Sequence, residues 1–152
     1  MNPTTATFQL VEYSFPEFTF RAVSHTESDE TVIPSVSFAA RGIYSPDSRR
    51  FKVIVDMKIS TDSEANLLQI LCEATFEFGR ELDSIPDYFY SNSIAIIYPY
   101  VRAFCSLITT QSNNVGIILP VLNLTTLGEK LKQNTTVQDN DTENHIVSGS
   151  SL

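Results

Sequence analysis

Strict alternation of apolar and other side chains in two stretches is the feature that most constrains this fold. In residues 51–59 every second residue is apolar, and lysine and aspartate occupy most positions between them. The same period recurs in residues 68–78, where glutamine, threonine and glutamate fill most of the alternate positions. A period of two places successive side chains on opposite faces of a β-strand. Each stretch therefore predicts a strand with one buried face.

Two further extended segments, residues 7–21 and 33–44, precede these strands and are separated by polar loops. In the first segment Val11, Tyr13 and Phe15 lie on the opposite parity from Phe8, so we expect apolar groups on both of its faces. Pro16 cannot donate a ladder hydrogen bond, which indicates an edge position or a bulge. Four strands joined by polar loops predict an antiparallel sheet with one covered face.

The pattern changes to a helical period after Gly79. Residues 80–90 predict an acidic loop, and residues 91–93 (SNS) offer N-cap side chains. Pro99 predicts a kink in the long helix that follows, and Thr125 or Thr126 is expected to begin a short helix ending at Leu131. The apolar positions that repeat along the long helix at its natural period are Ile94, Ile97, Tyr98, Val101, Phe104, Cys105 and Ile108.

The 152 residues suit a single α+β domain, predicted over residues 1–131, with residues 132–152 as a disordered polar and acidic tail. A net charge of −8 disfavours nucleic acid as a partner. The first residues do not resemble a secretory signal, and no apolar run predicts membrane insertion. We therefore expect a cytoplasmic protein.

No motif in the sequence predicts catalysis, a cofactor or a metal site. His25 and His145 lie in polar segments, and Cys72 and Cys105 lie in apolar patterns typical of buried free thiols. A hot-dog-like thioesterase, which also wraps a sheet around a long helix, would want a carboxylate near the helix start, and residues 91–95 contain none. A structural adaptor with one defined partner is a third possibility.

Several segments resemble the SecB export-chaperone family. Residues 97–102 (IYPYVR) and 119–124 (LPVLNL) are similar, in order and spacing, to the family's helix motif and to the lid that follows it. Residues 71–73 (LCE) and 7–9 (TFQ) resemble its fourth and first strands, so the resemblance covers residues 7–131. It implies a Greek-key-like four-stranded antiparallel sheet, a long helix and a short C-terminal helix.

The resemblance further implies an ATP-independent holding chaperone that binds unfolded or precursor polypeptides and has no catalytic activity. Such a protein is expected to be a homotetramer, built as a dimer of dimers, and to deliver clients to the SecA motor of the Sec translocase. The residues implied in docking that motor are Glu17, Leu71 and Glu73, although Arg21 stands where a second acid is usual. The alternative is a solitary SecB-like chaperone for a specific client such as an antitoxin.

Surplus aromatic and aliphatic residues before and after the long helix predict a client-binding groove, since loose apolar surface suits varied clients. The predicted client-binding residues are Tyr88, Phe89, Tyr90, Ile117, Ile118, Leu119, Val121 and Leu122. The alternative is that the aromatic cluster at residues 88–90 packs in the core. The residues predicted at the oligomer interface are Val11, Tyr13, Ile97, Val101 and Phe104.

Overall fold

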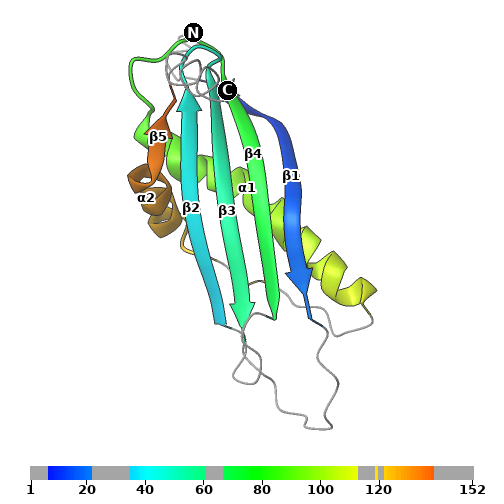
Figure 1. The fold of residues 1–152 in the computed structure, drawn as a ribbon. Coiled ribbons are helices and arrows are strands. Elements are labelled where there is room, and N and C mark those ends of the chain that lie inside the picture. The colour runs from blue at the N-terminus through cyan, green and yellow to red at the C-terminus, as the bar shows by residue number, and fades with distance from the viewer. Residues whose placement is uncertain (1–6, 22–34, 61–66, 113–118, 120–121, 139–152) are drawn as a thin grey trace, which may run out of the picture.

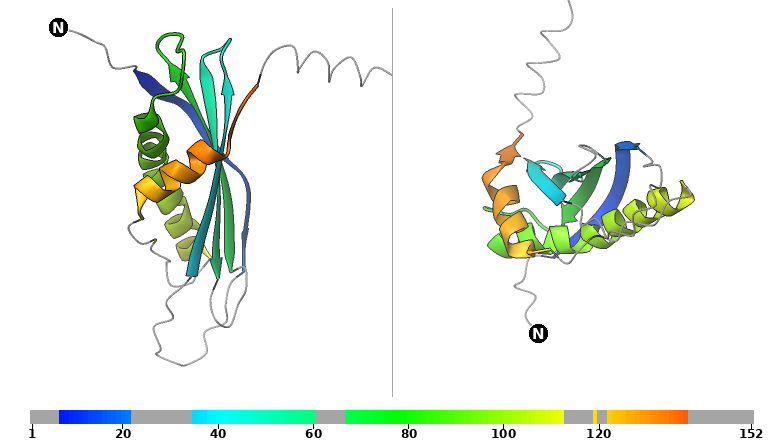
Figure 2. Two further views of the ribbon diagram at one scale, coloured as in Figure 1. Left: turned by 90° about the vertical axis from the view of Figure 1, so that its left-hand side faces the viewer. Right: turned by 90° about the horizontal axis from the view of Figure 1, so that it is seen from below.

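The described part of the chain folds into one curved sheet with two helices on the same side of it (Figures 1 and 2). A computed structural model describes residues 7–21, 35–60, 67–112, 119 and 122–138. The sheet order is β1-β4-β3-β2-β5. The elements are β1 (Phe8–Phe20), β2 (Ser35–Ser45), β3 (Arg50–Ser60), β4 (Leu68–Phe78), α1 (Asp87–Gln111), α2 (Leu124–Gln133) and β5 (Thr135–Val137).

The topology confirms the predicted Greek key but corrects the predicted sheet. Strands β2, β3 and β4 form an antiparallel meander, and β1 pairs antiparallel with β4. A fifth strand, β5, pairs in parallel with β2, so the sheet is mixed. Regular structure was expected to end at Leu131, but α2 continues to Gln133 and β5 follows it. The remaining part of the predicted tail, residues 139–152, lies outside the described residues.

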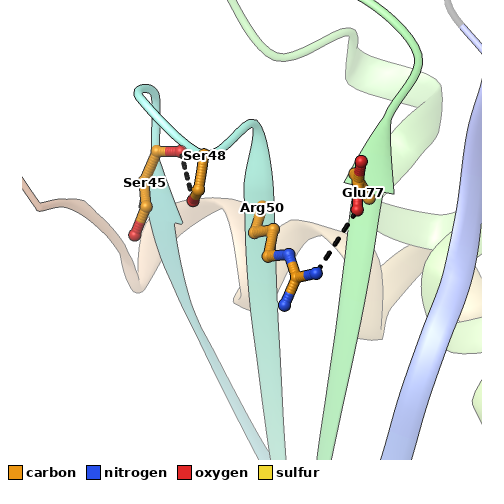
Figure 3. A network of polar contacts seen from close by, with 4 residues as sticks. All are labelled: Ser45, Ser48, Arg50 and Glu77. Carbon is orange, nitrogen blue, oxygen red and sulfur yellow. Dashed lines mark hydrogen bonds and ion pairs between the residues drawn. The ribbon is translucent and has the colours of Figure 1, made fainter.

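The β2–β3 hairpin closes through a four-residue turn, residues 46–49, as the proline and serines there predict. Ser48 Oγ donates to the Ser45 carbonyl at 3.3 Å (Figure 3), and Arg49 adopts a left-handed φ of 57°. The Arg49 carbonyl accepts from Phe78 N–H at 2.9 Å, which ties the turn to the end of β4. All eleven residues of β2 are then paired with β3.

The face of the sheet that α1 covers, called here the helix face, carries the core. The alternating residues of β3 and β4 point onto it, as predicted, and are almost fully buried. The opposite face, called the open face, carries the charged residues of the same strands. The buried helix-face side chains of these two strands are Phe51, Val53, Val55, Met57, Ile59, Leu68, Ile70, Cys72, Ala74, Phe76 and Phe78.

Two bulges in β1 overturn the prediction that its middle is apolar on both faces. The pairing with β4 slips between Leu10 and Glu12 and again between Ser14 and Glu17. Each slip inserts one extra residue and reverses the parity of the strand residues after it. Tyr13 and Phe15 therefore join the helix face, where their rings contact α1, and the argument for a second apolar face on this strand fails.

Helix α1 begins at Asp87, one turn earlier than predicted. It therefore includes the aromatic cluster at residues 88–90, which was expected in a loop. Its N-cap residue, Pro86, makes no capping side-chain bond. Ser93, a predicted cap, is buried inside the helix and donates to the Tyr90 carbonyl at 3.0 Å. Packing of the first turn on the core therefore overrides the capping signal. In α2 the cap is Asn123, whose side chain accepts from Thr126 N–H at 3.2 Å.

Candidate polypeptide-binding surfaces

Phe89 is a core residue and not the client-binding residue that was predicted. Its side chain is 0% exposed, and its ring centroid lies 4.7 Å from Phe51 and 4.9 Å from both Phe8 and Phe78. These edge-on and tilted contacts fix the start of α1 on the sheet. Phe89 therefore has no surface to offer a client, and the alternative that the cluster packs in the core holds for this residue.

The neighbours of Phe89 divide between core and surface. Tyr90 is buried, and desolvation raises the pKa of its hydroxyl. Tyr88 is 40% exposed and is the one residue of the predicted aromatic cluster at the surface. The period of the helix separates Tyr88 from Tyr90, because helical residues two positions apart do not share a face.

The predicted lid is described in part. Leu119 is almost fully buried, and Leu122 is half-buried against the edge of the core. Leu119 is therefore a core residue and not a client contact. Three other predicted client-binding residues lie outside the described residues, namely Ile117, Ile118 and Val121.

A row of half-buried apolar side chains runs between the edge strand β2, α1 and α2, and we call it the β2 margin. Its members pack against the core cluster while keeping part of their surface accessible. The rings of Phe38 and Tyr98 lie edge-on at 6.4 Å between centroids. The sequence reasoning missed this row, although the alternation of β2 was visible. The margin consists of Val36, Phe38, Tyr98, Leu122 and Leu124.

The outward side of α1 is also apolar and nearly uncharged. Ile96, Tyr100 and Leu107 are exposed at 38%, 41% and 54% and recur at helical spacing. Within α1 the charged residues are Asp87 and Arg102. The predicted interface residues Ile97 and Val101 instead face the sheet and are buried within the chain. The apolar side of α1 that is available to a second subunit is therefore the flank that carries Ile96 and Leu107, with Tyr100 at its border with β1.

An aromatic cluster joins β1 to the second half of α1. Tyr13 stacks on Tyr100 at 4.4 Å, and Phe18 meets Phe104 edge-on at 5.0 Å. Phe104, predicted at the oligomer interface, is half-buried in this cluster. Tyr13 and Val11, two other predicted interface residues, remain 42% and 41% exposed. The cluster leaves exposed aromatic surface at the outer edge of the sheet.

The residues predicted to dock an export motor come together on the open face. Glu17 pairs with Leu71 across β1 and β4, and Glu73 lies on the same face two residues further along β4. Lys52 Nζ lies 3.7 Å from Glu73 Oε2, and Arg50 lies 3.6 Å from Glu77 (Figure 3). These half-exposed pairs contribute little stability, but they offset much of the negative charge of this surface.

A hollow of about 590 Å³ opens on the open face beside β2. Ala39, Ile54 and Leu71 form its apolar part, with Arg41 and Asp56 beside them. The link from α2 to β5, residues 133–136, forms the other wall. Asp56 Oδ1 accepts from Gln69 Nε2 at 3.3 Å. The sequence reasoning did not find this hollow, because it depends on β5.

The described residues carry little that resembles a catalytic centre. They contain no group of three or more metal-ligating side chains. Cys72 and Cys105 are buried, and desolvation raises the pKa of each thiol to about 11, which keeps both protonated. The carboxylate that a thioesterase would need is present after all, since Asp87 opens α1. Its side chain is 84% exposed and pairs with Lys132 Nζ at 2.7 Å.

In the described part of the chain, α1 has the length and mean hydropathy of a membrane span. A third of its most apolar window, 33%, is buried inside the fold. Helices that pack on the core of a globular domain commonly pass the same test. The apolar character of α1 is thus divided between its sheet-facing side and the exposed side described above.

Comparison of the sequence with known proteins finds one partial relative. No family model matches the chain. The uncharacterised protein MJ0357 of Methanocaldococcus jannaschii is 35% identical over 71 residues, which are 43% of this chain and 46% of that protein. The chain therefore matches less than half the length of this relative.

Two solved structures match the chain at low sequence identity. One is the Rv1957 SecB-like chaperone of Mycobacterium tuberculosis in complex with a ChAD peptide from the Rv1956 HigA1 antitoxin. It matches with a TM-score of 0.62 and 14% identity over 76% of this chain and 91% of that one. A Streptococcus agalactiae protein of unknown function matches with a TM-score of 0.46 and 9% identity over 78% of this chain and 100% of that one. The first likeness shows that this chain has a SecB-like fold.

Proposed function

We propose that the protein is a holding chaperone that binds unfolded polypeptides without ATP and has no catalytic activity. The observation that carries this proposal is the β2 margin, an accessible row of apolar side chains on a SecB-like fold. Such a surface can bind many sequences, because its affinity comes from the apolar area that is buried and does not need an exact fit. The neighbour Rv1957 is itself a SecB-like chaperone in complex with an antitoxin peptide, which supports a polypeptide as the ligand.

The proposed assembly is a cytoplasmic homotetramer, a dimer of dimers. Exposed apolar side chains on the outward side of α1 and on β1 support association, because contiguous apolar patches on a free surface are uncommon in monomers. In this arrangement the stripe Ile96, Tyr100 and Leu107 contacts other subunits. The β2 margin lies toward the opposite edge of the sheet from β1 and stays available to clients.

Two client roles are compatible with this surface. Delivery to the SecA motor is supported by Glu17, Leu71 and Glu73 sharing the open face. Lys52 and Arg50 reduce the acidity of that face and so weaken the case for motor docking. A role outside export, with a client such as an antitoxin, is supported by the antitoxin peptide bound to Rv1957. We favour a role outside export, because electrostatic steering of a basic docking domain requires an uncompensated acidic surface.

Dilution of a chemically unfolded, aggregation-prone protein into buffer without nucleotide tests the proposal, with light scattering to follow aggregation. We expect suppression near one client per tetramer. Phe38→Ser shortens the β2 margin and should weaken suppression several-fold, while Val137→Ser, at a 61% exposed position outside the margin, should not. Circular dichroism confirms that both variants fold. A folded wild-type protein that leaves aggregation unchanged would refute the function.

A further inference from the structure

Arg102 is the only cation of α1, and it lies beside the β2 margin. The other charged residue of this helix is Asp87, fifteen positions earlier. Tyr98, a member of the margin, precedes Arg102 by four residues, so the two side chains lie on the same side of the helix. Desolvation raises the pKa of the Tyr98 hydroxyl, and the positive charge of Arg102 opposes that rise, which agrees with this proximity.

The guanidinium of Arg102 has no carboxylate partner in the described part of the chain. Its side chain is exposed, and the ion pairs among the described residues do not include it. By contrast, Arg50 and Lys52 on the open face lie 3.6 and 3.7 Å from glutamate oxygens. Arg102 is therefore a positive charge that the described subunit leaves uncompensated.

The elements packed around this part of α1 supply no acid within their described residues. On β2, residues 35–40 are serine, valine, phenylalanine and alanine. The charged residues of α2 lie toward the start of α1, because Lys132 pairs with Asp87 and Gly128 lies against Ser91. The carboxylates of β3 and β4 are on the open face, across the sheet from α1. A carboxylate that meets Arg102 at the margin must therefore come from a bound molecule.

We propose that Arg102 selects clients by binding a carboxylate that flanks the apolar segment held on the β2 margin. A guanidinium can form two parallel hydrogen bonds with a carboxylate, which adds directional recognition to a surface of non-directional apolar contacts. The apolar side chains of Phe38 and Tyr98 nearby strengthen such a pair relative to one in open water. The client class is an apolar segment next to an aspartate or glutamate. This inference rests on the proposed function and adds a specificity-determining residue to it.

The overall charge of the protein does not favour an acidic client. A net charge of −8 repels a carboxylate wherever it lies along the client. A contact with Arg102 acts on one position alone, because the attraction between exposed charges is largely screened beyond about 10 Å at moderate salt. The position of the acid along the client therefore distinguishes the effect of Arg102 from that of the whole protein.

Positional isomers of one peptide test the proposal. The probe is a fluorescein-labelled fourteen-residue peptide with a central apolar segment of valine and leucine, serine flanks, and a single glutamate that is moved through the flanks. All isomers have the same composition and net charge, so the charge of the whole protein acts on them alike. We expect one or two neighbouring positions to bind about fivefold more tightly than the others, the upper end for an exposed ion pair, and to lose this advantage at high salt.

Substitutions at Arg102 identify the group responsible. Arg102→Gln should abolish the positional preference and leave the weaker isomers within twofold of their wild-type affinity, because the apolar contacts remain. Arg102→Lys keeps the charge without the planar fork and should retain part of the preference. Arg102→Glu should make the favoured position the weakest one. Arg41→Gln removes an exposed cation on the open face and should leave the preference unchanged.

The outcomes separate this inference from the holding function. Isomers that bind alike, or a preference that survives in Arg102→Gln, would overturn the role of Arg102 while the holding function stands. A change in the mass of Arg102→Gln by light scattering overturns it as well, because Arg102 would then lie between subunits, although it is turned about 120° from Ile96 around the helix. Failure of every isomer to bind while the unfolded client is held has the same meaning. If neither the isomers nor the unfolded client binds, both proposals fall.

Discussion

The rings of Phe15 and Phe104 lie parallel, with 2° between their planes and 4.0 Å between their centroids. One ring comes from the bulged middle of β1 and the other from the second half of α1, far from the core cluster around Phe89. The contact shows that α1 is attached to the sheet by aromatic rings along much of its length. It also depends on the bulges, since Phe15 would otherwise point to the open face.

Truncation of this stack should loosen the second half of α1 from β1. Phe104→Ala removes a half-buried ring that also contacts Phe18, and we expect a loss of about 2 kcal/mol in the free energy of unfolding, below the ~3–5 kcal/mol of a fully buried phenylalanine. Urea unfolding followed by circular dichroism measures it. Thr110→Ala, at an exposed position of the same helix, is the control. Equal midpoints for the two variants would contradict the structural role of the stack.

Gly128 allows the backbones of α1 and α2 to approach closely. A Cβ atom at this position would lie 2.9 Å from Ser91 N and 3.0 Å from Ser91 Cα. Gly128→Ala gains about 1 kcal/mol in helix propensity, but we expect net destabilisation of about 1–3 kcal/mol because backbone atoms cannot yield as side chains do. Thr125→Ala raises the helix propensity at an exposed position of α2 and should stabilise the fold. Differential scanning calorimetry compares the two, and a higher Tm for Gly128→Ala would disprove the close contact.

The sequence predicted the strands of the meander and the long helix because alternation and helical period are local signals. β3 and β4 carry that alternation without interruption, so their buried faces were identified residue by residue. The first bulge in β1 has no local signal, because one inserted residue is indistinguishable from a change of face; the second was marked by Pro16 alone. The three residues of β5 are β-branched, but a run of three is too short to show alternation, so the strand is defined only by its contact with β2. The candidate binding surfaces were the part predicted least well, because both the β2 margin and the hollow lie along β2.

The buried thiols should make the fold less stable at alkaline pH. Desolvation raises the pKa of Cys72 and Cys105 to about 11 in the folded chain, above the ~8.5 of an exposed thiol. Between these values the unfolded chain loses protons that the folded chain retains, so the free energy of unfolding falls as pH rises. The slope is at most about 1.4 kcal/mol per pH unit for each thiol.

Urea unfolding at pH 7 and pH 10 measures this loss for the wild type and for the variant Cys72→Ala/Cys105→Ala. The variant starts from a lower stability, because it leaves small cavities, but its stability should fall less between the two pH values. Tyrosine titration contributes equally to both proteins and cancels in the comparison. Identical falls for the two proteins would show that the thiols are accessible in the fold, and rapid reaction of the native wild type with a thiol reagent would show the same.

Charge on the outward side of α1 should break the proposed tetramer without unfolding the subunit. Ile96→Lys and Leu107→Lys place ammonium groups on a stripe that is exposed within one chain, so the fold of the subunit should be unaffected. In an assembled tetramer the same charges would be desolvated between subunits, which is strongly unfavourable without a partner anion. We expect the mass measured by light scattering to fall from four subunits to two or one, while Val137→Lys, exposed on β5, keeps the wild-type mass. A double variant that remains tetrameric would place the subunit contacts elsewhere than on this stripe, and a wild-type protein that is itself monomeric would refute the tetramer.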